Sequence, residues 1–356
     1  MKIAILSMQK VVNYGSFMQS FALRKTIESL GHECEYLDVE DGVQLRGLER
    51  SKSLYLKKFL ERFLNIHMLK NLKQHRRLTK RFQEEFFGEL GVLERKHSEY
   101  DMVVIGSDEV FNFAQPTPWG FTEQLYGKVK EVKNVISYAG SFGHTTILDI
   151  EKHDVKTKIR DAMGSMKAIS VRDKNSVDIV EGLLEKKPVM NVDPVFLYDF
   201  SQHIVDVPEK DYIIIYTYPS RISGKAEIAK IVDFAQKHNK KLISIGFFFP
   251  WCDAVITPHP FEVLSYIKNA DYIITDTFHG TIFSIITNRK FGTLIRSTNS
   301  QKLTSLLETM KKSERIIRDI NSLEETLMQD IDYSETNDVI QYERERSIKY
   351  LKDNLS

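Results

Sequence analysis

The chain has 356 residues, of which 42% are hydrophobic and 28% are charged, a composition typical of globular proteins. This length is more than one hydrophobic core usually serves, so we expect two domains. The formal net charge of +1 excludes an overall positive field that would attract nucleic acid. Two cysteines, Cys34 and Cys252, are too few for a disulfide framework or a zinc site, and they favour a reducing compartment, the cytoplasm.

Neither a secretory signal nor a membrane span is visible in the sequence. The first ten residues read as a short strand without the apolar core of a signal peptide. The longest apolar runs, Tyr212–Tyr218 and Ile245–Trp251, are much shorter than a membrane-spanning helix. We therefore expect a soluble protein, with contact at the inner face of a membrane left open.

The N-terminal residues predict a strand, a helix and a second strand. Lys2–Leu6 is a short apolar run that a polar, glycine-containing turn follows. Ser16–Leu30 has apolar residues at helical spacing, and Gly31 stands where such a helix would end. Glu33–Leu37 is the next strand. A βαβ unit of this kind predicts an α/β fold with a parallel sheet.

Strand-like and helix-like runs alternate through the rest of the chain. The further strands that we expect are 102–105, 134–138, 168–171 and 189–192, then 212–218, 241–245, 272–275 and 290–295. Helices are expected at 224–238, 261–269, 281–288 and 301–311. Residues 198–209 are polar, contain Pro208 and separate the two sets. We therefore expect an N-terminal domain at 1–203, a C-terminal domain at 204–333, and a charged helix at 334–356 that packs back on the N-terminal domain.

One segment of the expected N-terminal domain, within 43–99, is strongly basic. Residues 46–81 contain twelve Lys or Arg but only two acids, Glu49 and Glu61, and their apolar residues recur at helical spacing. We favour a pair of amphipathic helices that pack on the sheet and turn basic faces to water. The alternative is a surface for anionic lipid headgroups or for a pyrophosphate-linked acceptor.

Polar groups follow five of the predicted strands. They are Asn13-Tyr14-Gly15-Ser16, Gly106-Ser107-Asp108 with Asn112, Ala139–Gly143, Arg172-Asp173 and Asp276–Gly280. Ligands of open α/β sheets bind beyond the carboxyl ends of the strands, so these groups are candidates for one site. Turn residues alone carry little weight. Charged residues at three separate strand ends, Asp108, Arg172 and His279, point more strongly to a site.

His279 is the sharpest of these candidates. It stands between a predicted strand and a predicted helix, and it precedes Gly280. Glycine there allows a ligand to approach the backbone, and the first amides of the helix can hold an anion. An imidazole in that place can exchange a proton near neutral pH. The position alone is equally consistent with a histidine that caps the helix or packs in the core.

Familiar cofactor and metal motifs are missing from the sequence. No G-x-G-x-x-G follows the first strand, Gly224-Lys225 lacks the rest of a phosphate-binding P-loop, and no H-E-x-x-H occurs. Asp330 and Asp332 lie in a polar stretch and not at a strand end. We therefore expect neither a required cofactor nor a required metal.

Six stretches, in this order, resemble the polysaccharide pyruvyl transferase family. They are NYGSFMQSFAL (Asn13–Leu23), DMVVIGSDEVFN (Asp101–Asn112), SYAGSFG (Ser137–Gly143), SVRDKNS (Ser170–Ser176), VDPVFL (Val192–Leu197) and ADYIITDTFHGTIFS (Ala270–Ser284), within a match over about residues 3–315. The resemblance implies two Rossmann-like domains of the GT-B kind, with the active site in the cleft between them. It also implies transfer of pyruvate from phosphoenolpyruvate onto a sugar as a ketal, with release of phosphate, in capsule, exopolysaccharide or cell-wall polymer synthesis.

The resemblance implies roles for the residues at the strand ends. His279 is expected to donate a proton to the methylene carbon or to the leaving phosphate, and Asp108 to act as base or hydroxyl anchor. Arg172 and the helix opening at Gly280 are expected to hold phosphoenolpyruvate. The other expected substrate-binding residues are Asn13, Tyr14, Gly15, Ser107, Asn112, Ser141, Thr277, Phe278, Arg296 and Lys302. Arg296 and Lys302 are included because some family members carry arginine where this chain has Thr277.

We expect the sugar acceptor, a polysaccharide or a lipid-linked oligosaccharide precursor, on the N-terminal domain. Trp119 or Phe121 would form an aromatic platform for it, unless these rings pack in the core. Phosphoenolpyruvate is expected on the C-terminal domain. Two other functions stay open: a GT-B glycosyltransferase that uses a nucleotide sugar, and a non-catalytic component of a polysaccharide-assembly complex.

Overall fold

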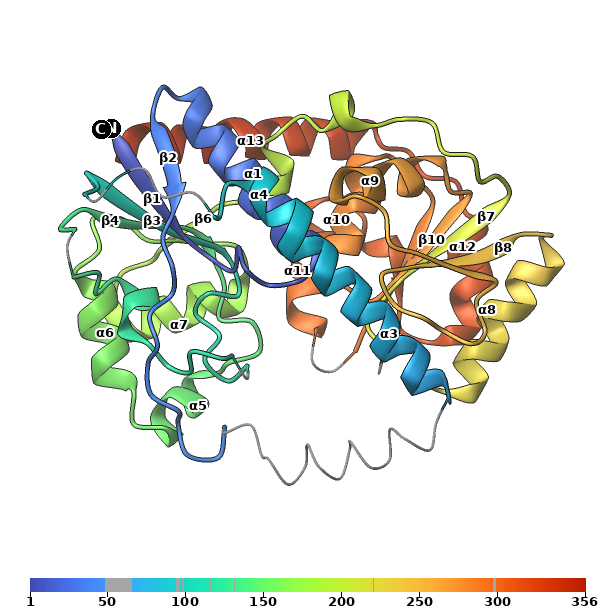
Figure 1. Ribbon diagram of the computed structural model, residues 1–356, viewed down its shortest axis with the longest axis horizontal. Helices are drawn as coiled ribbons and strands as arrows, with labels where there is room; N and C mark the ends of the chain where they lie inside the picture. The colour runs from blue at the N-terminus through green and yellow to red at the C-terminus, as the bar shows by residue number, and fades with distance from the viewer. Residues whose placement is uncertain are drawn as a thin grey trace. The chain divides into compact units, whose positions relative to one another are not determined.

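The computed structural model describes residues 1–48, 66–93, 97, 99–115, 117–130, 132–219, 221–296 and 299–356, which fall into two compact units (Figure 1). The first unit comprises Met1–Ser51, Phe87–Tyr198 and Ile340–Ser356, and the second comprises Lys52–Phe86 and Asp199–Val339. Residues 49–65 of the expected basic segment lie outside the described residues. The described helix of that segment falls in the second unit, whereas the expectation from sequence groups it with the first.

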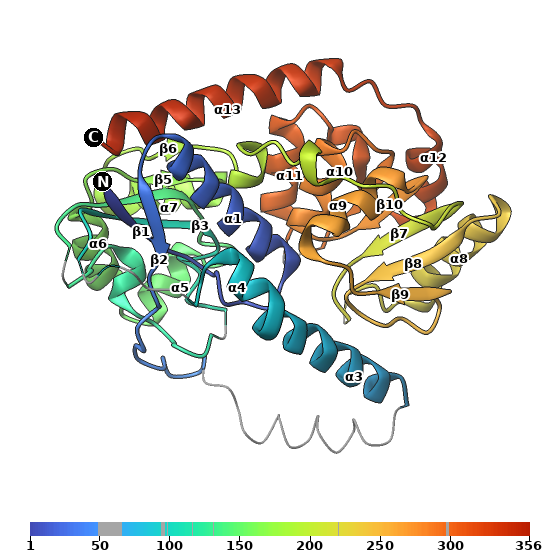
Figure 2. The ribbon, with the colours of Figure 1, turned by 45° about the horizontal axis from the view of Figure 1, so that its top comes forward.

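A six-stranded parallel sheet with the strand order β2-β1-β3-β4-β5-β6 forms the centre of the first unit (Figure 2). Its strands are β1 (Lys2–Leu6), β2 (Glu33–Tyr36), β3 (Met102–Asp108), β4 (Val135–Gly140), β5 (Ser170–Val171) and β6 (Val189–Met190). Its helices include α1 (Tyr14–Ser29), α4 (Phe87–Leu90), α5 (Ile147–Lys152), α6 (Lys156–Gly164) and α7 (Lys174–Leu184), with short 3-10 helices at Glu123–Tyr126 and Pro194–Phe196. β1 is buried after its first residue, as a strand covered on both faces must be. The strands predicted for this domain are confirmed, although β5 and β6 are shorter than expected.

A second six-stranded parallel sheet, with the order β12-β11-β10-β7-β8-β9, forms the centre of the second unit. Its strands are β7 (Tyr212–Tyr216), β8 (Lys241–Ile245), β9 (Ala254–Ile256), β10 (Tyr272–Thr275), β11 (Phe291–Leu294) and β12 (Ile316–Ile317). Its helices include α3 (Ile66–Arg81), the π-helical turn η1 (Phe82–Phe86), α8 (Lys225–Lys237), α9 (Pro260–Asn269), α10 (Phe278–Ile286), α11 (Ser300–Thr309) and α12 (Leu323–Met328), with 3-10 helices at Ser201–His203, Ser313–Arg315 and Ile320–Ser322. The sequence pattern misses β9 and β12, because runs of three and two residues show no periodicity.

Helix α10 begins at Phe278, earlier than the start at Thr281 that the sequence suggests. The backbone of Thr277 is extended, and its side-chain Oγ1 accepts a hydrogen bond from the amide of Gly280 at 3.0 Å. A threonine cap satisfies one of the amides that has no partner within the helix, so the helix can start at the next residue. His279 therefore lies in the first turn of α10.

The order of strands reverses once in each sheet. In the first sheet the chain moves from β1 outward to β2 and then returns to the other side of β1 with β3. In the second sheet β8 lies on one side of β7, and β10 lies on the other. At such a reversal the connections after two neighbouring strands leave in opposite directions, and a crevice opens at the carboxyl ends of the strands.

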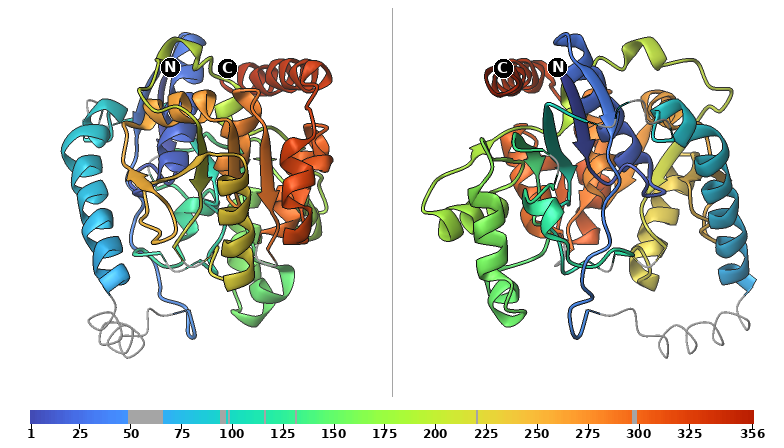
Figure 3. Two further views of the ribbon diagram at one scale, coloured as in Figure 1. Left: turned by 90° about the vertical axis from the view of Figure 1, so that its right-hand side faces the viewer. Right: turned by 60° about the vertical axis from the view of Figure 1, so that its left-hand side comes forward.

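The last helix, α13 (Ser334–Asn354), contributes its C-terminal part to the first unit. The hydroxyl of Tyr350 donates a hydrogen bond to the carbonyl of Ser137 on β4 at 2.9 Å, and the side chain of Leu351 is fully buried. The two chain ends lie close to one another in this unit (Figure 3). The end of the chain is thus part of the core of the first unit.

Replacing Leu351 by alanine removes a fully buried side chain and leaves a cavity. We expect Leu351→Ala to lower the free energy of unfolding by about 2–5 kcal/mol, measured by urea denaturation. Lys352→Ala, at the exposed neighbouring position, is the control and is expected to change it by less than about 0.5 kcal/mol. Equal stability of both variants would contradict the packing of this helix end.

Candidate functional site

A hydrogen bond from α1 bridges the carboxyl ends of β1 and β3, and the space beyond these strand ends is here called the first crevice. Asn13 caps this helix, and its Oδ1 accepts hydrogen bonds from the amides of Gly15 at 2.7 Å and Ser16 at 3.3 Å. The hydroxyl of Ser16 then donates to Asp108 Oδ2 at 2.7 Å. Tyr14, in the first turn, is buried. The structure therefore brings the predicted Asn13–Gly15 turn and Asp108 together at the reversal point of the sheet.

A buried ion-pair cluster fixes Asp108 from the other side. Arg172 donates from Nη2 to Asp108 Oδ1 at 3.2 Å and from Nη1 to Asp193 Oδ2 at 2.8 Å. The side chain of Arg172 is only 2% exposed and that of Asp193 is fully buried. Burial opposes the charge of Arg172, but the two carboxylates outweigh it and raise the pKa of the guanidinium. The cluster thus holds one cation and two anions.

The arrangement corrects the expected role of Arg172. A cation that binds phosphoenolpyruvate directly must face the crevice, but this guanidinium is buried and engaged by two protein carboxylates. It orients Asp108 instead. Asp108 accepts from Ser16, Arg172 and the amide of Glu109, and a carboxylate has about four acceptor positions. Three of these acceptor positions are therefore used by donors of the protein itself.

Three other predicted binding residues lie beneath the loops of the first unit. Ser107 and Ser141 are fully buried, and the Ser141 hydroxyl donates to Asp173 Oδ2 at 2.6 Å. Asn112 is 2% exposed and joins Glu109 to Thr145 through hydrogen bonds of 2.7 and 2.8 Å. These side chains form hydrogen bonds that hold the loops after β3 and β4 in place. Their hydrogen bonds fix the loops that border the crevice, but the side chains themselves are buried.

The two aromatic candidates for the acceptor differ. Phe121 is 5% exposed and packs edge-on against Phe113 with ring centres 6.0 Å apart, so it is a core residue and no platform. Trp119 is partly exposed and packs against the same core. Only Trp119 of the two keeps a surface that a sugar ring can reach.

The crevice between β7 and β10 has a carboxylate at the corresponding place. The hydroxyl of Thr217, after β7, donates to Asp276 Oδ1, after β10, at 2.6 Å. Asp276 is fully buried, and Arg296 Nε lies 3.6 Å from its Oδ2. Arg221 donates to its backbone carbonyl at 3.0 Å. Burial raises the pKa of Asp276, against the hydrogen bond from Thr217 and the charges of Arg221 and Arg296, which lower it.

His279 lies three residues beyond this carboxylate, in the first turn of α10. The residue is partly exposed, but its ring nitrogen Nε2 is buried, and the ring packs against Phe278 and Phe283 with ring centres 5.6 and 6.0 Å apart. The first turn of a helix carries partial positive charge from its amides, which attracts anions. An imidazole there can pass a proton to a bound anion.

Glycine is needed at position 280 for a reason other than the expected one. A Cβ at Gly280 would lie 2.3 Å from Thr275 Oγ1 and 2.8 Å from a ring carbon of Tyr216. The glycine therefore allows α10 to pack closely on β7 and β10. Its close neighbours are protein atoms, and no ligand needs to be invoked to explain it.

The remaining predicted cations differ in their surroundings. Arg296 donates to Glu227 Oε1 at 2.6 Å and is 27% exposed, so it borders the second crevice as an ion-paired group. Lys302, partly exposed, stands in the first turn of α11. Sequence reasoning missed Arg221, whose link to Asp276 arises only from the fold. It gave Asp276 no role of its own, although this residue was among the polar groups that follow a predicted strand.

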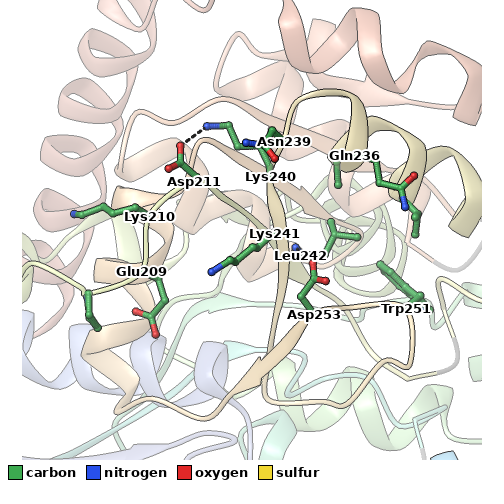
Figure 4. Close-up of a pocket in the computed structure, with 13 residues that line it drawn as sticks. Glu209, Lys210, Asp211, Gln236, Asn239, Lys240, Lys241, Leu242, Trp251 and Asp253 are labelled. Carbon is green, nitrogen blue, oxygen red and sulfur yellow. Dashed lines mark hydrogen bonds and ion pairs between the residues drawn. The ribbon is translucent and has the colours of Figure 1, made fainter.

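Among the described residues, no group of three or more His, Cys, Asp or Glu side chains is placed to hold a metal ion. Within that same part of the chain, no helix combines the length and apolar character that crossing a membrane requires. A surface pocket of about 890 Å³ lies at the opposite edge of the second sheet, next to Lys241, Trp251 and the ion pair of Lys240 with Asp211 (Figure 4). Because it lies at the amino ends of β7 and β8, it is remote from His279.

Comparison with solved structures agrees with this architecture. The glycotransferase of kitacinnamycin superposes with a TM-score of 0.52 at 10% identity, over 100% of this chain and 99% of that one. Arabidopsis thaliana UGT89C1 complexed with quercetin gives a TM-score of 0.50 at 11% identity, with 98% of each chain covered. Identities this low show the fold alone: two Rossmann-like units of the GT-B kind. No curated protein sequence matches the chain.

The family is shown by a separate comparison. The model of the polysaccharide pyruvyl transferase family matches residues 13–297, which include β3, β10 and the crevice residues Asn13, Asp108, Arg172 and His279. The chain therefore belongs to the polysaccharide pyruvyl transferase family and is a transferase.

The buried cluster predicts a large effect of Arg172 on stability. Arg172→Ala leaves Asp108 and Asp193 without their cation, and we expect it to lower the free energy of unfolding by about 3–5 kcal/mol in urea denaturation. Arg160→Ala is the matched control, because Arg160 pairs with Asp161 at the surface and such pairs contribute less than about 1 kcal/mol. Similar small losses in both variants would show that the cluster is not desolvated.

The raised pKa of Asp276 predicts a pH effect. A carboxyl with a higher pKa in the folded state stabilises the fold below its unfolded pKa of about 4, and this contribution is lost as pH rises through the folded pKa. Asp276→Asn stays neutral at every pH. The melting temperature of the wild type relative to that of the variant is therefore expected to fall as pH rises through this window. A difference in melting temperature that does not change with pH would rule out the raised pKa of Asp276.

Proposed function

We propose that the protein transfers the pyruvyl group of phosphoenolpyruvate to a sugar of a polysaccharide or of a lipid-linked oligosaccharide precursor. The product is a pyruvate ketal, and phosphate is released. Membership of the polysaccharide pyruvyl transferase family supports a role in pyruvyl transfer. The observation that carries the finer proposal is the place of His279, in the first turn of α10 at the reversal point of the second sheet.

Phosphoenolpyruvate suits the second crevice because it carries a carboxylate and a phosphate. The amides that open α10 attract such anions. Arg221 uses one of its five N–H donors in the hydrogen bond to the carbonyl of Asp276. Its guanidinium lies 4.9 Å from the centre of the Tyr218 ring. Arg296 and Lys302 supply further positive charge. A cation in place of Thr277 is therefore not required.

The reaction proceeds through a proton transfer to carbon. The His279 imidazolium donates its proton to the methylene carbon, and C2 becomes an oxocarbenium-like electrophile. One sugar hydroxyl attacks C2, and its proton restores the imidazolium. A second hydroxyl forms the other C–O bond as the C2–O bond to phosphate breaks, and its proton leaves with the phosphate.

The first crevice is the place proposed for the acceptor. Asp108 keeps one acceptor position for a sugar hydroxyl, and Arg172 and Ser16 hold its carboxylate in one orientation. Trp119 offers a partly exposed ring against which the apolar face of a sugar can stack. A lipid-linked acceptor would bring the cytoplasmic protein to the inner face of the membrane, with the basic segment 46–81 as the contact. Capsule or exopolysaccharide synthesis is the process that this acceptor implies.

Loss of the proton donor should reduce turnover without loss of binding. His279→Gln is expected to lower the rate of phosphate release from phosphoenolpyruvate in the presence of acceptor by about 10²–10⁴-fold. Stabilisation by phosphoenolpyruvate in a thermal-shift assay should persist, since the cations and amides remain. His203→Gln, in the same unit, is the control and should keep wild-type turnover.

Two outcomes would overturn this proposal. Near-wild-type turnover of a folded His279→Gln variant would exclude the histidine as the acid. Stabilisation of the wild type by a nucleoside diphosphate and not by phosphoenolpyruvate would favour a glycosyltransferase that uses a nucleotide sugar.

A further inference from the structure

Helix α3 (Ile66–Arg81) carries an unusual concentration of positive charge. Its sequence, IHMLKNLKQHRRLTKR, contains six Lys or Arg and no Asp or Glu. The formal net charge of the whole chain is only +1, so this charge is local. A single-sign segment in an otherwise balanced chain is a candidate interaction surface.

Contacts within the second unit fix which side of α3 faces inward. Gln74 and Leu78 are buried. The side chain of Asn71 accepts a hydrogen bond from the amide of Phe248 at 2.8 Å, and the ring of His75 stacks on Phe247 with centres 6.3 Å apart. These four residues recur at helical spacing on one side. The rotation of the helix about its own axis is therefore set by packing.

The opposite side of α3 is a row of exposed cations, here called the cationic face: Lys73, Arg76, Arg77 and Lys80. Spacings of three, four and seven residues place them on one face of a helix. Lys80 lies 3.8 Å from Glu84, but both side chains are more than half exposed, so the pair neutralises it weakly. Among the described residues, no acid forms an ion pair with Lys73, Arg76 or Arg77.

Leu69 adds an apolar group to this face. It stands one turn before Lys73 and is 42% exposed. The helix has 16 residues and is about 24 Å long, so it presents its cations along a nearly straight line. A straight row of cations with an apolar residue at one end fits a flat layer of phosphates above hydrocarbon.

We propose that the cationic face of α3 docks the protein on a bilayer surface that contains anionic phospholipids. The inference rests on the proposed function for its purpose, because a lipid-linked acceptor is held at such a surface. The attraction itself needs only the charges: each Lys or Arg near an anionic membrane strengthens binding roughly five-fold. Docking through α3 would concentrate the enzyme where its acceptor lies.

Sedimentation with vesicles tests the proposal. The wild type is expected to sediment with equimolar phosphatidylcholine and phosphatidylglycerol vesicles, and not with phosphatidylcholine alone. The variant Lys73→Gln, Arg76→Gln, Arg77→Gln should bind the mixed vesicles about 100-fold more weakly, since three cations are lost. Glutamine keeps high helix propensity, so the helix is expected to persist. Raising the salt concentration should release the wild type.

The matched control lies on helix α6 of the first unit. Lys156→Gln, Lys158→Gln, Arg160→Gln also removes three exposed cations, two Lys and one Arg, and should leave vesicle binding unchanged. Equal binding by the α3 variant and the wild type, or equal binding to both kinds of vesicle, would overturn the proposal. So would binding to duplex DNA without binding to vesicles. Stabilisation by phosphoenolpyruvate should be the same in all three proteins, so a failure of docking is distinguishable from a failure of the proposed reaction.

Discussion

The geometry of the first crevice depends on one buried guanidinium. Arg172 lies between Asp108 and Asp193, with its side chain 2% exposed. A charge in that place is tolerated only while its partners stay in position, because leaving it uncompensated costs several kcal/mol. Asp108 ends β3, Arg172 follows β5 and Asp193 follows β6, so the ion pairs fix three loops relative to one another. Ser16 joins α1 to the same carboxylate.

The carboxylate at the equivalent place in the second sheet has different partners from those of Asp108. Asp276 is buried, but its nearest cation, Arg296, is shared with Glu227. Burial raises the pKa of Asp276. The two crevices therefore differ in their chemistry. The first contains a carboxylate that hydrogen bonds fix in one orientation, and the second contains a buried carboxylate beside two arginines and the first turn of α10.

The sequence predicts most strands and the candidate residues that follow them, because buried parallel strands are short apolar runs and their carboxyl ends are recognisable. It does not predict what each residue does there. The burial of Arg172, the core packing of Phe121 and the contact of Gly280 with Tyr216 all depend on neighbours distant in sequence. The start of α10 at Phe278 could have been predicted from the sequence, because Thr277 is a good capping residue. A glycine in the first turn pointed instead to a later start.

The central claim is that carbon receives a proton from His279 before the ketal forms. This step is tested directly by running the reaction in deuterium oxide with phosphoenolpyruvate and an acceptor glycan. The mass of the product is then measured by mass spectrometry. The imidazole exchanges its proton with solvent, so the methyl group of the ketal should carry one deuterium, with one phosphate released per ketal. A ketal without solvent-derived deuterium, or phosphoenolpyruvate left intact while a sugar is transferred, would contradict the account.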